Sequence, residues 1–502
     1  MSRNKKGFYF KKENRTLAYF IPKIQKGDKY EAVPLSLERT HHYLDIKDTK
    51  TKFNSPVKSK TKPKSTKSKN QYQPKKIQLT DESTLILYRN IDIPITYISG
   101  VIEGGSSLLP KEKDWDCEII SRTLIKGSKK YPKEEIERIL DTTGSQIDFS
   151  CDEESFKFNI ASLNDNLSET IDLFTDLLFN PTFPAKIILN EKNKLIAEII
   201  ELKDNTQQTA RRRFSQLIYP EDHPYYSNSF DKDIKLIKTI DRKDLLLTHN
   251  ILIRKNKALL SLLSNIKDDE LNRYTKQIEN SFVVEEKKIE SKANIPDVLL
   301  RDDIKKESVF INDKMQSDVF LGHAGNIKRT DPDFYKIYIA NHILGGSSLS
   351  SRLSKKVRDE SGLVYTIYSY VNATHGKGEF GIYFGSNNNN VDKAIELVKA
   401  ELKDFVKNGI TEAELQKTKA SLIDSFAARN LSTNRTVANT LLGIEFYNLG
   451  KDYIHDYPKI INSIKLSEVN PVIKKYIYPD KLNIVIAGQY KQQKEQISQK
   501  KQ

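Results

Sequence analysis

The sequence predicts an α+β protein of two duplicated domains, each a mostly antiparallel sheet covered by helices, behind a disordered basic N-terminal tail. Three observations predict this arrangement. The 502 residues, of which 37% are hydrophobic and 9% aromatic, are sufficient to bury ordinary globular cores. The positive charge gathers near the N-terminus, and one sequence pattern recurs 224 residues later at three separated places.

The basic tail is predicted over residues 1–77. Residues 1–80 hold 21 Lys and Arg against 6 Asp and Glu, whereas the rest of the chain holds 61 of each. From Lys50 to Lys76 the lysines stand among Ser, Thr, Pro and Gln, a composition that cannot bury enough apolar area to fold. We favour a solvated linker over a polyanion binder, because no basic recognition helix or aromatic-studded basic sheet follows. Nucleic acid is therefore not an expected partner, and a tether to an anionic partner is the weaker alternative.

The repeated pattern begins with a strand and a helix. Apolar residues alternate with other residues over 156–160 and again over 380–384, which places one face of each strand on a core. Asn166 then precedes apolar residues at every third or fourth position as far as residue 178. Asn390 precedes the same pattern as far as residue 405. Each half is therefore expected to contain one amphipathic helix packed on its sheet.

The repeated pattern closes with a short helical segment and a strand. Residues 237–245 match residues 461–469, and the apolar runs Ala258–Leu263 and Leu482–Ala487 follow in the same register. Because all three matches share one offset, we predict a first domain over 78–290 and a second over 291–490. A polar tail is expected over 491–502.

Two cysteines and the absence of long apolar runs bear on the compartment. Cys117 and Cys151 are too few for a disulfide framework and are not spaced as a metal-binding pair, which fits a reducing compartment. No stretch reaches the roughly 20 apolar residues that cross a bilayer, and the N-terminus lacks the apolar core of a secretory signal. A cytoplasmic location without a membrane span is expected.

Five segments carry a resemblance to a known family. They are Thr123–Ser128, Asn180–Phe183, Leu344–Gly346, Ser351–Leu353, and the stretch that holds Val357–Glu360 and Gly362–Tyr365. Together they resemble the superfamily of inverted-motif zinc peptidases that includes insulinase, pitrilysin and the mitochondrial processing peptidase. The resemblance extends from about residue 80 to about residue 490 and implies the duplicated α+β fold of that family.

The zinc motif of the family is degenerate in this chain. Active members carry H-x-x-E-H on a helix, where the histidines bind zinc and the glutamate activates water. Counted back from Thr123, the corresponding residues are Glu118 and Arg122 in place of the histidines and Ser121 in place of the general base. The guanidinium adds a fixed positive charge where the metal would lie. The resemblance therefore implies that this chain holds no cofactor.

A residual carboxylate stands where the family has its third zinc ligand. Glu198 follows Arg122 by 76 residues, but one carboxylate does not make a metal site. Glu191, Glu198 and Glu201 also fit the exposed face of a helix whose buried side includes Leu195, and we favour that interpretation. None of the eight histidines lies three or four residues from another, so no second ligand set is expected.

The second half keeps an arginine and a tyrosine that the resemblance marks as substrate-binding. Arg358 and Tyr365 stand at the positions that face the zinc from the second domain in the family. There the phenol donates to a substrate carbonyl or developing oxyanion in the transition state, and the guanidinium holds a carbonyl or carboxylate. The alternative is structural: Arg358 pairs with Asp359 or Glu360, and Tyr365 packs in the sheet. His375 and Lys377 are expected in a turn and receive no role.

These features favour a non-catalytic, substrate-binding subunit of a heterodimeric zinc metallopeptidase acting on peptides or unfolded segments. Its partners would be a peptidase subunit with H-x-x-E-H, which holds the zinc, and the peptide substrate. A structural or assembly protein of the same fold is the alternative from another class. A peptidase active alone is disfavoured, because no ligand triad can be assembled from these histidines.

Overall fold

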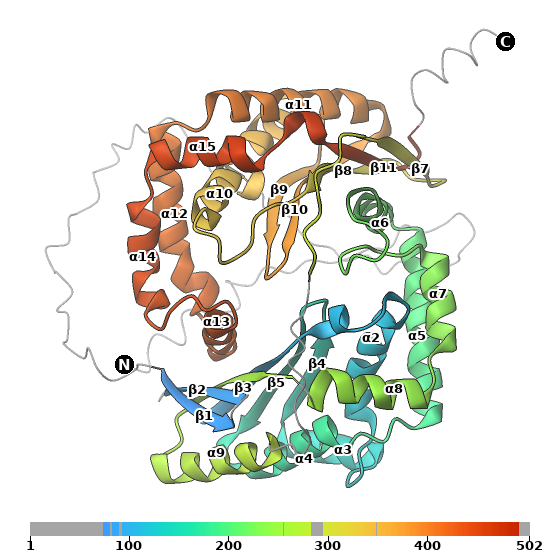
Figure 1. Cartoon of the computed structure of the whole chain (residues 1–502), viewed down its shortest axis with the longest axis vertical. Helices are drawn as coiled ribbons and strands as arrows, with labels where there is room; N and C mark the ends of the chain where they lie inside the picture. Colours follow the sequence, from blue (N-terminus) through green and yellow to red (C-terminus); the bar gives the residue numbers. More distant parts are fainter. Residues whose placement is uncertain are drawn as a thin grey trace, which may run out of the picture. The chain divides into compact units, whose positions relative to one another are not determined.

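The computed structural model describes residues 74–80, 83–89, 93–254, 256–282, 295–347 and 349–490. It confirms an α+β protein with two mostly antiparallel sheets covered by helices (Figure 1). Nearly all of the predicted basic tail and the predicted polar segment 491–502 lie outside the described residues. Among the helices described, none has the length and apolar character needed to pass through a bilayer.

The two sheets have the same strand order. The first runs β1-β2-β6-β3-β5-β4 and the second runs β7-β11-β8-β10-β9. In each sheet one neighbouring pair is parallel, β2 with β6 and β7 with β11, and the other pairs are antiparallel. The strands are β1 (Lys75–Thr80), β2 (Ser83–Arg89), β3 (Ile95–Glu103), β4 (Gln146–Cys151), β5 (Ser155–Leu163), β6 (Ala258–Ser264), β7 (Lys306–Phe310), β8 (Gln316–Ala324), β9 (Thr366–Ala373), β10 (Lys377–Asn387) and β11 (Asn483–Gly488). The second sheet thus repeats the first without β1.

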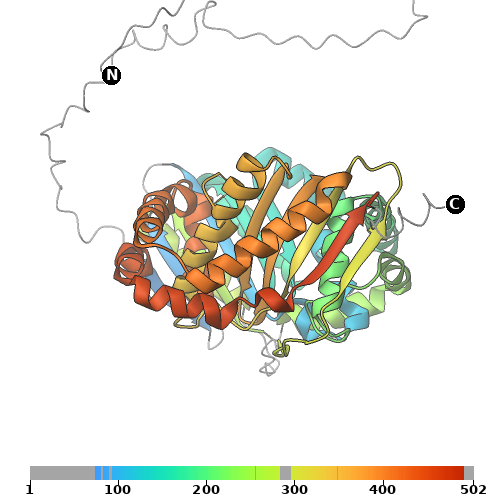
Figure 2. The ribbon, with the colours of Figure 1, turned by 90° about the horizontal axis from the view of Figure 1, so that it is seen from above.

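The helices follow the duplication as well. Those of the first half are α2 (Asp114–Thr123), α3 (Lys133–Thr143), α4 (Leu167–Phe179), α5 (Ala185–Lys203), α6 (Thr206–Ile218), α7 (Phe230–Thr239), α8 (Arg242–His249) and α9 (Asp268–Phe282). Those of the second half are α10 (Phe334–Asn341), α11 (Val391–Asn408), α12 (Glu412–Asn430), α13 (Asn434–Phe446), α14 (Tyr453–Ser463) and α15 (Leu466–Tyr476). The repeated strand and helix are β5 with α4 and β10 with α11, so the predicted repeat corresponds to real elements. Figure 2 shows α11 lying across the second sheet.

Each half lends one helix to the sheet of the other half. Helix α6 packs on β8 and β11, where the fully buried Phe214 ring lies 6.0 Å from the Phe320 ring. Helix α13 packs on β3 and β6, and the Ser261 hydroxyl donates to the Ala438 carbonyl at 2.8 Å. Since α6 and α13 hold equivalent places in the repeat, the exchange is reciprocal. The two sheets are therefore joined through helices as well as through loops.

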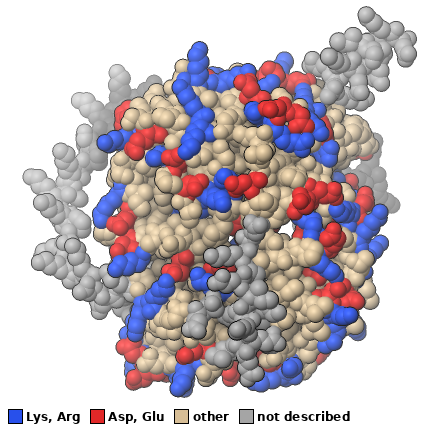
Figure 3. All heavy atoms as spheres, in the orientation of Figure 1, with Lys and Arg blue, Asp and Glu red and all other residues tan. Residues whose placement is uncertain are grey.

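Charge on the described surface is mixed. In Figure 3, Lys and Arg alternate with Asp and Glu over the face shown. This agrees with the equal numbers of both signs after residue 80. On this face the described residues form no broad surface of one sign that would attract a polyanion.

Candidate functional site: a guanidinium at the metal position

Helix α2 carries the degenerate zinc motif and packs against α5. Ile119, Ile120 and Thr123 are completely buried and fix one side of the helix on the core. The remaining motif positions, Glu118 and Arg122, lie one turn apart on the other side, as residues four apart do on a helix. Burial of the apolar side thus directs the former ligand positions toward α5.

Arg122 joins the other polar positions of the predicted site. Its Nε lies 2.6 Å from Glu118 Oε1, while Nη1 and Nη2 lie 2.9 and 2.8 Å from the two carboxylate oxygens of Glu198. Ser121 is not part of this cluster, because its hydroxyl donates to the Glu118 carbonyl oxygen at 2.8 Å. The planar guanidinium therefore links α2 to α5 by a bidentate ion pair.

The electrostatics of this cluster favour the charged forms. The hydrogen bond from Arg122 lowers the pKa of Glu198, and the hydrogen bond to Glu198 raises the pKa of Arg122. The fixed positive charge between the two carboxylates repels a second cation at the same place. In the described part of the chain, no group of three or more His, Cys, Asp or Glu side chains is arranged to hold a metal ion.

The helix that bears Glu198 agrees only partly with the sequence interpretation. Glu198 and Glu201 are exposed, and Leu195 and Ile199 are buried, as that interpretation required. Glu191 was placed on the exposed face and is instead buried, with a side chain 10% exposed and an ion pair to Lys194 at 2.8 Å. Glu191 is buried because it falls one turn before Leu195, on the side of α5 that packs inward.

Arg358 and Tyr365 lie on either side of a tight turn. Arg358 belongs to the π-helical turn η8 (Ser354–Glu360). Two residues after this turn comes Gly362, whose φ of 59° is left-handed. The chain then becomes extended, and Tyr365 N–H donates to the Gly385 carbonyl at 2.9 Å just before β9. Val357 and Val364 are buried, so the turn is anchored between the two polar residues.

Arg358 has the contact that a purely structural role predicts, and Tyr365 does not. Arg358 Nε lies 2.8 Å from Asp359 Oδ1, which is the ion pair that this alternative expected. Tyr365 is 67% exposed and does not pack in the sheet. Their role in binding substrate stays a prediction.

Two protein-family models match this chain. Residues 101–224 match the model of the insulinase family, peptidase family M16, and residues 239–422 match the model of the peptidase M16 inactive domain. The chain belongs to the insulinase family. The segments around Arg122 and Arg358 both lie inside these matched ranges.

The matches between this insulinase-family chain and individual relatives cover almost the whole length of those relatives. It is 23% identical over 82% of its residues to "Non-peptidase homolog YmxG" of Helicobacter pylori, of which 93% is covered. It is 24% identical over 79% of its residues to "Uncharacterized zinc protease YmxG" of Bacillus subtilis, of which 94% is covered. A crystal structure of a peptidase M16 inactive domain from Pseudomonas fluorescens superimposes with a TM-score of 0.73 and 22% identity, covering 83% of this chain and 98% of that one. That structural likeness establishes the fold.

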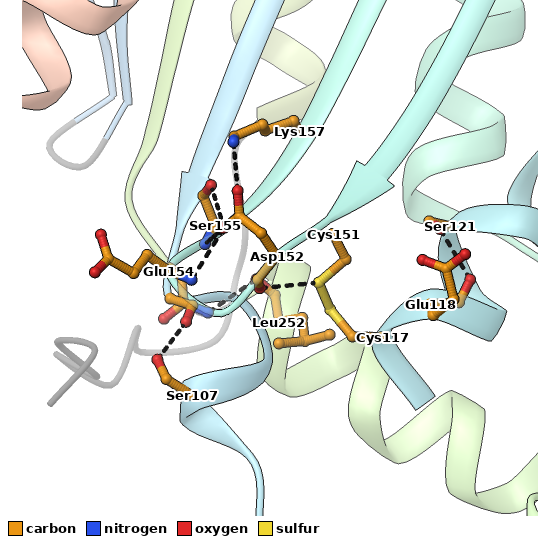
Figure 4. The surroundings of a disulfide bond; sticks show 12 residues. Ser107, Cys117, Glu118, Ser121, Cys151, Asp152, Glu154, Ser155, Lys157 and Leu252 are labelled. Atoms are coloured by element: carbon orange, nitrogen blue, oxygen red, sulfur yellow. Dashed lines mark hydrogen bonds and ion pairs between the residues drawn. A yellow bond between two sulfur atoms is a disulfide. The ribbon is translucent and has the colours of Figure 1, made fainter. Parts of the chain in front are cut away.

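A disulfide lies beside the degenerate motif of the insulinase-family chain. Cys117 of α2 is bonded to Cys151 at the end of β4, with 5.9 Å between their Cα atoms, and Figure 4 shows the bond next to Glu118. The small number and the spacing of the cysteines fitted a reducing compartment, whereas a disulfide is typical of an oxidising one or of a redox-active pair. The sequence separation of 34 positions between the cysteines gave no local sign that α2 packs on β4. The cytoplasmic location stays a prediction.

A buried carboxylate that sequence analysis missed joins the two halves. Glu154 lies before β5 and accepts hydrogen bonds from the backbone N–H groups of His375 and Gly376, both at 3.1 Å, and from the Thr374 hydroxyl at 2.6 Å. Tyr225 also donates to it, and the His375 ring lies 3.4 Å away. Burial alone would raise the pKa of Glu154, but these donors outweigh it and lower the pKa to about 2. His375 does lie in the turn between β9 and β10, and its pKa is raised by the bond to Glu154.

Proposed function

We propose that this chain is the non-catalytic, substrate-binding subunit of a heterodimeric zinc metallopeptidase that acts on peptides or unfolded segments. The observation that carries the proposal is the exposure of Tyr365, which follows Arg358 by seven positions, in a chain whose metal position is filled by Arg122. An exposed phenol has no packing role that would explain it. Its hydroxyl is available to a substrate held between two subunits.

Inactivity of the isolated chain follows from the Arg122 cluster. A guanidinium that already binds Glu118 and Glu198 leaves no ligand set for zinc, and Ser121 cannot act as a general base for a metal-bound water. The name of the Helicobacter pylori relative, a non-peptidase homolog, supports the same proposal. In the active complex the zinc would belong to a partner subunit with H-x-x-E-H, and this chain would hold no cofactor.

Substrate would bind as an extended segment near β9. This strand ends the order of the second sheet, and Tyr365 immediately precedes it. Its outer edge would offer main-chain donors and acceptors to a peptide away from Ser369, whose carbonyl accepts from Asn341 Nδ2. The phenol would donate to the carbonyl oxygen as negative charge develops there. Arg358, whose ion-pair partner Asp359 is itself about half exposed, would exchange that carboxylate for a substrate group.

Reconstitution with a zinc-bearing partner tests the proposal. The chain would be purified alone and together with an H-x-x-E-H subunit from the same genome, and hydrolysis of a casein-derived peptide mixture would be measured. We expect activity only in the mixture, lowered about 10² to 10³-fold by Tyr365→Phe through loss of one transition-state donor. Tyr131→Phe is the matched control, since its half-buried phenol lies in the first half and should leave activity unchanged.

Two other outcomes have definite meanings. Tight assembly with the partner in the absence of any effect of Tyr365→Phe would favour the structural or assembly role. Stoichiometric zinc in the isolated chain, or peptide cleavage by it, would contradict the proposal outright.

A further inference from the structure

A pocket of about 480 Å³ lies among four helices of the second half. Helices α10, α12, α13 and α14 surround it, and Figure 1 shows them grouped at one end of the second sheet. Its size is within the range of small-molecule sites. Aromatic rings make up much of its wall, and two arginines, Arg329 and Arg429, reach it from the loop after β8 and from the end of α12.

Arg329 is held in place by aromatic groups. Its guanidinium carbon lies 4.1 Å from the centre of the Phe334 ring, and Nη2 donates to the hydroxyls of Tyr335 and Tyr453 at 3.1 and 3.3 Å. Those two hydroxyls are 2.9 Å apart. Rings and phenols orient the cation but do not neutralise it, so the side chain is positioned with its charge uncompensated.

Among the residues that the structure describes, no carboxylate pairs with either arginine of the pocket. Within the described residues, Arg329 makes its side-chain hydrogen bonds to phenols, and neither Arg329 nor Arg429 takes part in an ion pair. Arg429 lines the same pocket from the end of α12. Two cations and several exposed ring faces therefore meet in one concave site.

In the first half, the place that corresponds to this pocket contains a buried carboxylate. There α2, α6 and α7 correspond to α10, α13 and α14. The buried Asp233 of α7 accepts from Trp115 Nε1 at 2.8 Å and forms an ion pair with Arg212. The residue 224 positions after Asp233 is Tyr457, a pocket-lining ring. The second half thus keeps an aromatic and arginine-rich pocket but lacks the internal anion.

We infer that this pocket binds a small ligand that carries both a carboxylate and an aromatic ring. The carboxylate takes the place that Asp233 holds in the first half and forms charge-assisted hydrogen bonds with Arg329, with Arg429 adding attraction from the rim. The ring packs against the tyrosine and phenylalanine faces of the wall. A free aromatic acid and the C-terminal residue of a peptide both supply this chemistry. The site does not depend on the proposed zinc-bearing partner.

Calorimetric titration of the full chain tests the site with three probes. These are N-acetyl-L-phenylalanine, its C-terminal amide, and a pentapeptide that ends in phenylalanine with a free carboxylate. We expect the acid, the pentapeptide or both to bind, and the amide to bind at least about tenfold more weakly. Binding of the pentapeptide alone identifies a peptide terminus as the source, and binding of the acid assigns a free aromatic acid.

Three variants separate the charge from the shape of the pocket. Arg329→Gln should weaken binding at least about tenfold and Arg429→Gln severalfold. Arg138→Gln, an exposed arginine on α3 paired with Glu135, should have no effect. Gly443→Leu fills the pocket from α13, where a side chain meets open space and a helix former replaces glycine, so binding should be lost with the fold intact.

The inference is overturned by any of three results. The first is that no probe binds at millimolar concentration. The second is that the acid and the amide bind equally well. The third is that Arg329→Gln and Gly443→Leu both bind as the wild type does while unfolding at the same temperature as the wild type.

Discussion

Arg122 connects α2 to α5 in the way that a bound dication would. Unlike a metal ion, it is part of the chain and cannot be removed by a chelator. Replacing it with methionine keeps the length of the side chain but leaves Glu118 and Glu198 unpaired. All three side chains are partly exposed, so we expect a loss of only about 1–2 kcal/mol in the free energy of unfolding. Urea denaturation at about pH 7 measures this loss. Arg138→Met, which breaks an exposed pair on α3, is the control and should change the free energy of unfolding much less than Arg122→Met does.

The pH dependence of the same pair has a definite sign. Glu198 has a lower pKa when folded than its ordinary value of 4.5, so the pair stabilises the fold above that pH and the stabilisation is lost as the pH falls. The difference between wild type and Arg122→Met should therefore shrink toward about pH 3. A difference that stays constant down to that pH would show that the ion pair is not its origin.

Restoring the motif should restore a metal site. In the triple variant Glu118→His, Ser121→Glu and Arg122→His, two imidazoles one turn apart would face Glu198, which the guanidinium now reaches at 2.8 Å. We expect about one zinc ion per chain by elemental analysis after dialysis. Adding Glu198→Gln to the triple variant should abolish stoichiometric zinc. Equal zinc in both variants would mean that α2 and α5 do not present a common ligand set.

At the level of elements, the disulfide fixes α2 to β4. In the chain-entropy account, closing a loop with a sequence separation of 34 residues stabilises the fold by about 3–4 kcal/mol. Cys151→Ser, measured against wild type under non-reducing conditions, should lower the free energy of unfolding by that order. Adding reductant should destabilise wild type to a similar extent and leave the variant unchanged. A reductant effect of equal size on both proteins would contradict a role for this bond.

The order and the duplication of elements were predictable from sequence, because alternation in strands and three-to-four spacing in helices are local patterns. Residues 156–160 became β5, and the helix after Asn166 became α4, with their repeats in β10 and α11. The degenerate motif was also readable, since it is contiguous on α2. Contacts between distant segments were not: the Cys117–Cys151 bond, the burial of Glu154 and the reciprocal exchange of α6 and α13 leave no local signal.

Between the two halves, Glu154 and His375 make a junction whose stability depends on pH. Glu154 has a pKa of about 2, so its contribution is complete above its ordinary value of 4.5 and is lost as the pH falls from 4.5 toward 2. The pKa of His375 is raised, so its contribution is complete below its ordinary value of 6.5 and is lost as the pH rises through the folded value. The junction should therefore contribute most between about pH 4.5 and 6.5.

Glu154→Gln tests this junction directly. The amide keeps the size of the side chain but cannot accept from all the donors that converge on the carboxylate, so we expect a loss of about 2–4 kcal/mol near pH 5.5. Urea denaturation from about pH 3 to pH 8 should show the largest difference from wild type in the window above. A difference that grows toward pH 3 would contradict the lowered pKa.

The exchange of α6 and α13 makes the two halves depend on each other. Without α13, the first sheet would expose the apolar face that Leu441 and Leu442 now cover. Without α6, the second sheet would expose the face that Phe214 covers. We therefore expect residues 74–290 and residues 291–490, produced separately, to be aggregated or to lack a cooperative unfolding transition. Produced together as two chains, they should associate and regain it, because each then receives its missing helix. Cooperative folding of either fragment alone would show that the exchanged helices are dispensable and that each half is an independent domain.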